Sequence, residues 1–238
     1  MTIGTQPAKP ATNREICGYV GGVTDRLAHD PAGFPSRAEV TIAGYRQDLP
    51  TARLGFAATD PNVRASSLTA LQRCGDLDEL TLLRALRDAS VTVARRAVEL
   101  SVDELEKAAE VDEQLLAMLK HESDVLVEVV AWALGERHQE AATELGERVA
   151  AALNRIVMQH TDPLVREAAV AALGSVGLPS GLPAVLHATV DKATVRRRAV
   201  LALAAFEGDA VEAALVRART DRDWQVRQAA EDLMNPRV

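Results

Sequence analysis

Residues 162–174 read Asp-Pro-Leu-Val-Arg-Glu-Ala-Ala-Val-Ala-Ala-Leu-Gly, and this stretch decides the fold. Apolar residues follow Val165 at +4, +7 and +8, so they share one face of a helix with 3.6 residues per turn. Asp162 and Pro163 make a good helix start, because Asp caps free backbone N–H groups and Pro tolerates the first helical position. The stretch therefore predicts an amphipathic helix that begins at Pro163.

The same pattern recurs along the chain at intervals of 30 to 39 residues. Each copy begins at an apolar anchor residue, and the anchors are Val63, Val93, Leu126, Val165, Val195 and Val226. A second amphipathic segment rich in Ala and Leu lies between successive anchors, at 78–86, 112–120, 145–158, 182–190 and 209–217. Two helices and two turns need about this length, so the sequence predicts stacked helix pairs. Several glycines are expected in the turns between helices, namely Gly75, Gly135, Gly174, Gly177, Gly181 and Gly208.

The composition also favours an all-α fold. Alanine and leucine, both strong helix formers, are abundant, whereas aromatic residues, which strands favour, make up only 3% of the chain. Cys17 and Cys74 lie far apart in unlike contexts, which argues against a disulfide framework or a zinc site. The N-terminus lacks the apolar segment of a signal peptide, and no run approaches the about 18 apolar residues of a membrane span. We therefore expect a soluble cytoplasmic protein that does not bind membranes.

Three copies of the pattern resemble the signature of HEAT and HEAT-like (phycobilin-lyase-type) repeats. They are Asp-Pro-Asn-Val-Arg at 60–64, Asp-Pro-Leu-Val-Arg at 162–166 and Asp-Trp-Gln-Val-Arg at 223–227. The resemblance implies an all-α, right-handed α-solenoid of about six HEAT-like helix pairs. It also implies that the second helices line the concave side, with contributions from 145–158 and 209–219. We expect a solenoid over residues 36–238, preceded by a flexible segment at 1–35 with a short helix at 14–27.

The resemblance further implies a ladder of Asp and Arg side chains between successive repeats. The expected members are Asp60, Arg64, Asp162, Arg166, Arg196, Asp223 and Arg227. The arginine position holds Ala94 and Val127 in the central repeats. We therefore expect the ladder to be interrupted there.

The central part of the chain is acidic. Residues 99–150 contain 14 acidic and 4 basic side chains, which can attract a basic partner or form a solvated helix face. Trp132 lies about 120° from the anchor face of its helix, so it either packs on a neighbouring repeat or anchors a partner. Trp224 replaces proline at a helix start, and we expect it to shield the last repeat. The candidate partner-binding residues are Trp132, Glu136, His138, Glu140, Glu144 and Glu147.

No catalytic, metal or cofactor site is expected. His121-Glu122 is a single His-Glu pair, whereas HEAT-like di-iron hydroxylases use several such pairs. Cys17 and Cys74 have no histidine at a recognisable local spacing. The glycine-rich segment at 18–22 lacks the Lys-Ser/Thr ending of a phosphate-binding loop.

A nucleic-acid surface is not expected either. Arginines cluster at 196–198 and 217–227, and HEAT-like DNA glycosylases need a basic groove. However, Arg196 and Arg227 occupy ladder positions, the central repeats are acidic and aromatic residues are scarce. The sequence therefore predicts a non-catalytic adaptor or scaffold that binds a protein partner, with a basic surface, through a curved solenoid surface. The alternatives are a subunit of a HEAT-like lyase-type enzyme acting on a protein-bound tetrapyrrole and a nucleic-acid-binding HEAT-like protein.

Overall fold

The computed structural model describes residues 33–102, 108–139 and 142–235, so the expected helix at 14–27 lies outside the described residues. Over these ranges the chain forms thirteen α-helices and two short 3-10 helices, with no strand. The all-α prediction is therefore confirmed. The helices divide into two compact units, residues 1–74 and 75–238, which are described separately. A single solenoid over residues 36–238 stays a prediction.

Unit 1 contains α2 (Arg37–Arg46), α3 (Leu49–Phe56) and α4 (Pro61–Arg73). Ser36 starts α2 through a capping box, in which its hydroxyl accepts from the Glu39 N–H and the Glu39 carboxylate accepts from the Ser36 N–H. A Cβ added to Gly44 of α2 would lie 2.8 Å from the Cα of Ala70 on α4. The missing side chain therefore lets α2 and α4 pack closely, and α3 packs on both.

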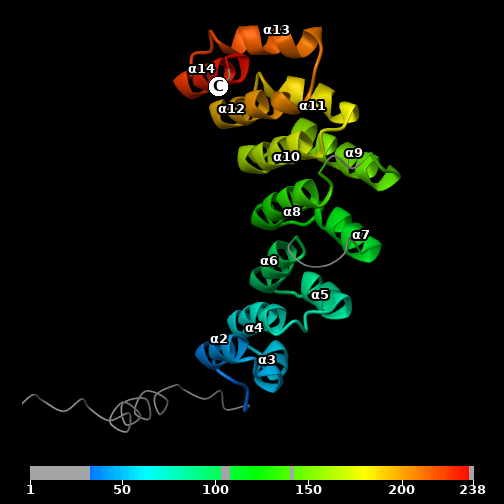
Figure 1. The fold of residues 1–238 in the computed structure, drawn as a ribbon, viewed down its shortest axis with the longest axis vertical. Coiled ribbons are helices and arrows are strands. Elements are labelled where there is room, and N and C mark those ends of the chain that lie inside the picture. The colour runs from blue at the N-terminus through cyan, green and yellow to red at the C-terminus, as the bar shows by residue number, and fades with distance from the viewer. Residues whose placement is uncertain (1–32, 103–107, 140–141, 236–238) are drawn as a thin grey trace, which may run out of the picture. The chain divides into compact units, whose positions relative to one another are not determined.

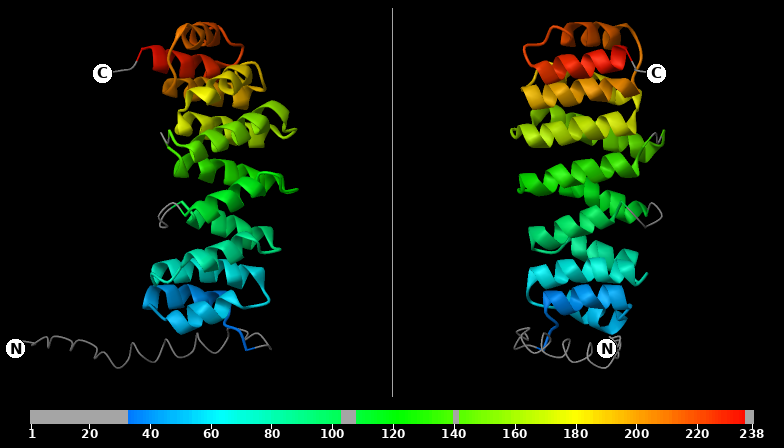
Figure 2. Two further views of the ribbon diagram at one scale, coloured as in Figure 1. Left: turned by 90° about the vertical axis from the view of Figure 1, so that its right-hand side faces the viewer. Right: turned by 60° about the vertical axis from the view of Figure 1, so that its left-hand side comes forward.

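Unit 2 is built from ten α-helices in two layers. They are α5 (Glu79–Leu86), α6 (Val91–Leu100), α7 (Ala109–Met118), α8 (Asp124–Arg137), α9 (Glu144–Gln159), α10 (Pro163–Val176), α11 (Leu182–Ala188), α12 (Ala193–Ala202), α13 (Asp209–Ala218) and α14 (Trp224–Met234). The 3-10 helices cover Pro179–Gly181 and Leu203–Ala205. Helices α6, α8, α10, α12 and α14, which carry the anchors, form one layer and pack on one another in sequence (Figure 1). Two further views show the same succession of helix pairs within unit 2 (Figure 2).

The anchors and the residues that follow them at helical spacing make the core. All six anchor residues are buried. In α10 the +4, +7 and +8 residues, Ala169, Ala172 and Leu173, are also buried. Each helix pair contacts only its neighbours in a stack of repeats. The apolar helix faces buried between neighbouring pairs therefore stabilise the fold. None of the described helices combines the length and apolar composition needed to cross a lipid bilayer.

Gly135 and Gly174 do not lie in turns, which corrects the expectation from the sequence. They lie inside α8 and α10, where a Cβ would come within 2.7 Å of the Cα of Ala172 and 2.9 Å of the Cβ of Ala202, respectively. These glycines therefore allow α8, α10 and α12 to approach closely. The turn interpretation does hold for Gly208, whose φ of 113° is in a region that L-residues with a side chain avoid.

Candidate protein-binding groove

Successive repeats at the C-terminal end of unit 2 are joined by bidentate Arg–Asp ion pairs. Arg166 of α10 donates from Nε and Nη2 to the carboxylate of Asp191, with both distances 2.7 Å. Arg196 of α12 donates in the same way to Asp221, at 2.8 and 2.7 Å. The hydrogen bonds from these arginines hold the pKa of Asp191 and of Asp221 below its usual value. The paired geometry fixes the turns before the anchor helices α12 and α14 against the preceding anchor helix.

The acidic partners in this ladder are not the aspartates that the motif suggested. Asp60, Asp162 and Asp223 instead cap their own helices, each accepting a backbone N–H two residues ahead at 2.8, 2.7 and 2.9 Å. Arg64 and Arg227 donate to carbonyl oxygens of the preceding turn, and the closer contact of each is 2.8 Å. The motif Asp is therefore a helix cap, and the interrepeat acid lies in the turn just before the next anchor helix.

The central repeats carry a different ionic contact. Ala94 and Val127, at the arginine position, are buried in α6 and α8. Asp112 of α7 is fully buried and accepts a 2.6 Å hydrogen bond from Nε of Arg137, at the end of α8. The Arg137 guanidinium also donates to the carbonyl of Ser101. An internal charge pair thus joins α7, α8 and the end of α6.

His138 completes this buried cluster. Its Nε2 lies 3.2 Å from Oδ1 of Asp112, and its side chain is as buried as that of Arg137. Burial alone raises the pKa of the Asp112 carboxyl, but hydrogen bonds and positive charge from His138 and Arg137 outweigh it, so the pKa lies below its usual value. Because His138 is in the interior, it does not belong to the surface that the sequence suggested for a partner.

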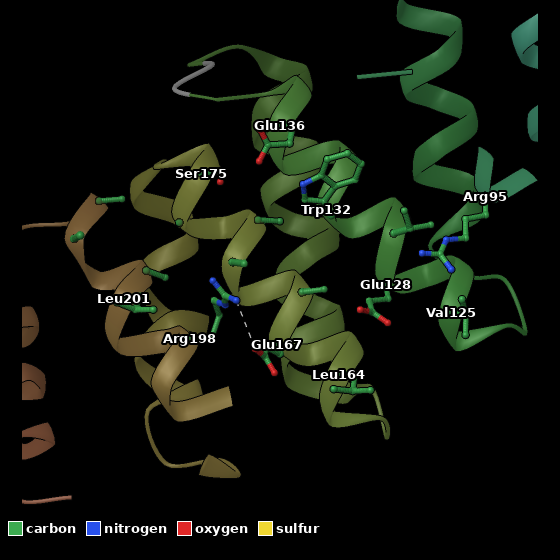
Figure 3. Close-up of a pocket in the computed structure, with 18 residues that line it drawn as sticks. Arg95, Val125, Glu128, Trp132, Glu136, Leu164, Glu167, Ser175, Arg198 and Leu201 are labelled. Carbon is green, nitrogen blue, oxygen red and sulfur yellow. Dashed lines mark ion pairs between the residues drawn. The ribbon is translucent and has the colours of Figure 1, made fainter. Parts of the chain in front are cut away.

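A groove of about 730 Å³ lies over the anchor layer of unit 2 (Figure 3). Its lining comes from α8, α10, α12 and the following 3-10 helix, with Arg95 of α6 at one edge. Much of this lining is small: Ala168, Ala171, Ala172, Gly174, Ser175, Ala202, Ala204 and Ala205. Small residues on adjacent helices leave a hollow that larger side chains would fill.

Large exposed apolar side chains surround this hollow. Val125 and Trp132 come from α8, Leu164 from α10 and Leu201 from α12, and all four are exposed although they line the same groove. The sequence did not decide whether Trp132 packs on a neighbouring repeat or anchors a partner. In the structure the residue is 42% exposed. Its indole therefore contributes to the wall of the groove and remains accessible from outside (Figure 3).

Charged side chains flank the apolar ones. Glu128 and Glu136 lie one helical turn before and after Trp132 on α8 and line the groove. Glu167 of α10 also lines it, and its Oε1 lies 3.6 Å from Nη2 of Arg198 on α12. This region therefore combines an apolar hollow with both acidic and basic groups.

The other acidic candidates lie elsewhere. Glu144 and Glu147 are exposed on α9, which does not line the groove, and Glu140 lies outside the described residues. The expected concave contributors at 145–158 and 209–219 do not line this groove either. The anchor helices form the groove instead, because their alanines and glycines permit close packing and leave space above. The sequence contained a pattern that could have indicated the groove. Large apolar residues such as Leu164 lie off the anchor face, next to runs of alanine and glycine.

Two further predictions have structural outcomes. Trp224 is 64% exposed at the first position of α14, so most of its ring does not shield the last repeat. In the arginine cluster, Arg196 is buried in the ladder and Arg198 pairs with Glu167, so neither is a free phosphate-binding group. Within the described ranges, no three His, Cys, Asp or Glu side chains come together in a way that could hold a metal ion.

Comparison with solved structures identifies the architecture. A designed armadillo repeat protein is 19% identical, with 79% of this chain and 100% of that chain covered and a TM-score of 0.53. An engineered protein is 16% identical, with 79% and 95% covered and a TM-score of 0.57. A designed armadillo repeat protein in complex with the peptide (KR)4 is 17% identical, with 79% and 98% covered and a TM-score of 0.55. At these identities the likeness concerns the fold alone.

Comparison of the sequence itself with curated proteins gives no significant match. The family model for HEAT repeats, in contrast, matches residues 112–204 and 150–235, two overlapping stretches that together span just over half of the chain. The matched stretches contain the Arg–Asp ladder, the buried Asp112 cluster and most of the groove. The chain belongs to the HEAT-repeat family.

Proposed function

We propose that this protein is a non-catalytic adaptor that binds a segment of a protein partner in the groove over α8, α10 and α12. One observation carries the proposal: Val125, Trp132, Leu164 and Leu201 are all exposed, and all surround one hollow lined by small residues. Apolar side chains gathered around a concavity with a charged margin are typical of protein-binding surfaces.

Trp132 is the expected anchor of this interface. Tryptophan is enriched among residues that carry most of the binding energy, because it buries a large area with few rotatable bonds. The alanines beside it leave room for a partner side chain against the indole. The designed armadillo repeat protein in complex with the peptide (KR)4 has a similar fold, which supports a peptide segment as the bound partner.

Site-specific photo-crosslinking in cells tests the proposal. A photoreactive amino acid replaces Leu164 or Leu201 in the groove, and a matched control replaces Glu147 on α9. We expect both groove positions to crosslink to the same protein, which the control position does not capture. The Trp132→Ala and Ala171→Glu variants should abolish that crosslink, while Trp224→Ala should leave it unchanged.

The outcomes separate binding in the groove from other contacts. A partner captured equally from position 147 and from the groove contradicts the proposal, because it would bind elsewhere or nonspecifically. The absence of a reproducible crosslink from both groove positions also contradicts it. Circular dichroism of each variant ensures that a lost crosslink reflects the surface and not an unfolded protein.

A further inference from the structure

We infer that the groove selects a basic segment, in which a Lys or Arg side chain lies over Trp132 between Glu128 and Glu136 and an apolar neighbour enters the hollow. The inference rests on the proposed function and adds the chemistry of the partner. It arises from the placement of an exposed aromatic ring between two carboxylates on one helix face, beside an apolar concavity.

The spacing along α8 brings these three side chains together. Glu128 precedes Trp132 by four residues and Glu136 follows it by four, so all three share one face of the helix. With a rise of 1.5 Å per residue, the Cα atom of each glutamate is about 6 Å from that of Trp132 along the axis. Figure 3 shows the indole between the two glutamates on α8. An ammonium or guanidinium over the ring is attracted by its π-face and by both carboxylates.

The two carboxylates are available for such a cation. Among the described residues, Glu128 and Glu136 have no ion pair with Lys, Arg or His, and Glu136 accepts only an amide hydrogen bond of 2.9 Å from Gln139. The basic groups of the groove are already engaged, since Arg95 lies 3.1 Å from Glu99 and Arg198 pairs with Glu167. The unmatched charge next to Trp132 is therefore negative.

The charge of the surrounding chain favours the same class of partner. Residues 99–150 carry 14 acidic and 4 basic side chains, so the region repels acidic peptides and polyanions. Acidic residues farther than a Debye length, about 8 Å at physiological salt, act weakly. The two glutamates beside Trp132 should therefore decide the preference, and more distant ones such as Glu144 and Glu147 should not.

The groove also sets the size of the segment. Its lining extends from α6 to α12, and packed helices lie about 8–10 Å apart, so the groove crosses about 25 Å. An extended chain advances about 3.3 Å per residue, which gives a segment of about eight residues. Val125, Leu164 and Leu201 line the same groove as Trp132, so an apolar residue of the segment would be buried against this lining.

A peptide array measures this selectivity directly. Each spot holds random peptides of about eight residues, with one position fixed as Lys, Glu or norleucine and a nearby position fixed as Leu. Retention of fluorescent full-length protein is compared for the wild type, Glu128→Gln/Glu136→Gln, Trp132→Leu and Ala171→Glu. The matched control is Glu144→Gln/Glu147→Gln, which makes the same charge change on α9.

We expect the wild type to favour Lys over Glu and norleucine. The Glu128→Gln/Glu136→Gln variant should lower that preference about fivefold to tenfold, and Trp132→Leu about threefold. The control variant should keep it. An equal loss in the control would overturn the inference, because the acidic region as a whole would then set the preference.

The remaining outcomes distinguish the inference from the proposed function. Retention that Ala171→Glu abolishes, but that is the same for Lys, Glu and norleucine, overturns the basic selectivity and leaves a peptide-binding groove. Retention that Ala171→Glu leaves unchanged for every spot overturns both, since the groove would not be the binding surface. Greater retention on the Glu spots also overturns the inference and indicates an acidic partner.

Discussion

Replacing Asp112 by Asn should destabilise this protein more than any single surface change. The carboxylate is fully buried, and it accepts a 2.6 Å hydrogen bond from Nε of Arg137. Asparagine keeps the size and loses the charge, so the guanidinium remains buried without its counterion. Removal of one partner from a buried ion pair costs about 3–5 kcal/mol. For a domain of this size, that is a decrease of about 6–20 °C in the midpoint of thermal unfolding.

The double variant Asp112→Leu/Arg137→Met separates an unpaired charge from a simple loss of packing. Both positions become apolar, so neither member of the Arg137–Asp112 pair is left as an unpaired charge in the interior. Replacement of a buried ion pair by well-packed apolar residues is often close to neutral, within about 1–2 kcal/mol. The double variant should therefore be more stable than Asp112→Asn, although it changes more atoms. The difference, about 2 kcal/mol or more, reflects the cost of a guanidinium that stays buried without its counterion.

Urea denaturation followed by far-UV circular dichroism provides the free energies of unfolding. Glu113→Gln is the matched control, because this carboxylate neighbours Asp112 in α7 but is exposed, with an exposed ion pair to Arg148. It should leave the midpoint nearly unchanged. The reasoning is refuted if Asp112→Asn unfolds within about 1 kcal/mol of the wild type, or if the double variant is the less stable of the two.

Three further variants test the packing, the ladder and the groove. Gly135→Ala should lower the free energy of unfolding by about 1–2 kcal/mol in urea denaturation, because its Cβ would lie 2.7 Å from the Cα of Ala172, and a stability gain from helix propensity would contradict the close packing. The pKa of Asp191 is lowered by Arg166, so its stabilisation is present above the usual value of 3.8 and is lost as pH falls through the lower folded value. Arg166→Met should therefore flatten the acid side of the pH dependence measured by calorimetry, and an unchanged profile would exclude this pair as its source. Trp132→Ala should change the free energy of unfolding by less than about 1 kcal/mol in the same urea assay, since the ring is 42% exposed, and a larger loss would mean that it supports the core.

Local signals made the helices predictable. The 3.6-residue spacing after Val165 and the Asp-Pro pair before it led to the helix that the structure contains, Pro163–Val176. The expected second helices at 182–190 and 209–217 also match α11 and α13 to within two residues at each end. Such features act within one helix, so no knowledge of the neighbouring repeat was needed.

Glycine was harder to interpret because one residue type serves two purposes. Gly208 has a positive φ and lies in the turn directly before α13, as the turn interpretation required. Gly135 lies inside α8 because Ala172, from the next repeat, is so close that no side chain fits. The same sequence letter is consistent with both, and only the position of α10 decides between them.

The ionic residues were only partly predictable for the same reason. The Arg166 position follows from the motif, but its acidic partner, Asp191, lies four residues before its anchor, whereas Asp221 lies five before its own. A variable turn length therefore hides the partner in the sequence. Arg137 and His138 look like surface residues among charged neighbours, and their partner Asp112 lies 25 or more residues away. Long-range pairing of this kind leaves no local pattern.

The groove is prepared for binding by the contacts that hold its helices together. At one end of the anchor helices, Arg166 and Arg196 hold successive repeats together through their bidentate ion pairs with aspartate. Elsewhere along the same layer, Gly135 and Gly174 let α8, α10 and α12 pack with almost no space between backbones.

Helices held by charge pairs and by backbone contact lose little further freedom when a segment binds. The partner then loses most of the conformational entropy on binding, and the protein loses little. More of the interaction energy therefore contributes to affinity. A hollow of about 730 Å³ with one exposed tryptophan can therefore suffice as a specific site, because it does not have to be assembled first.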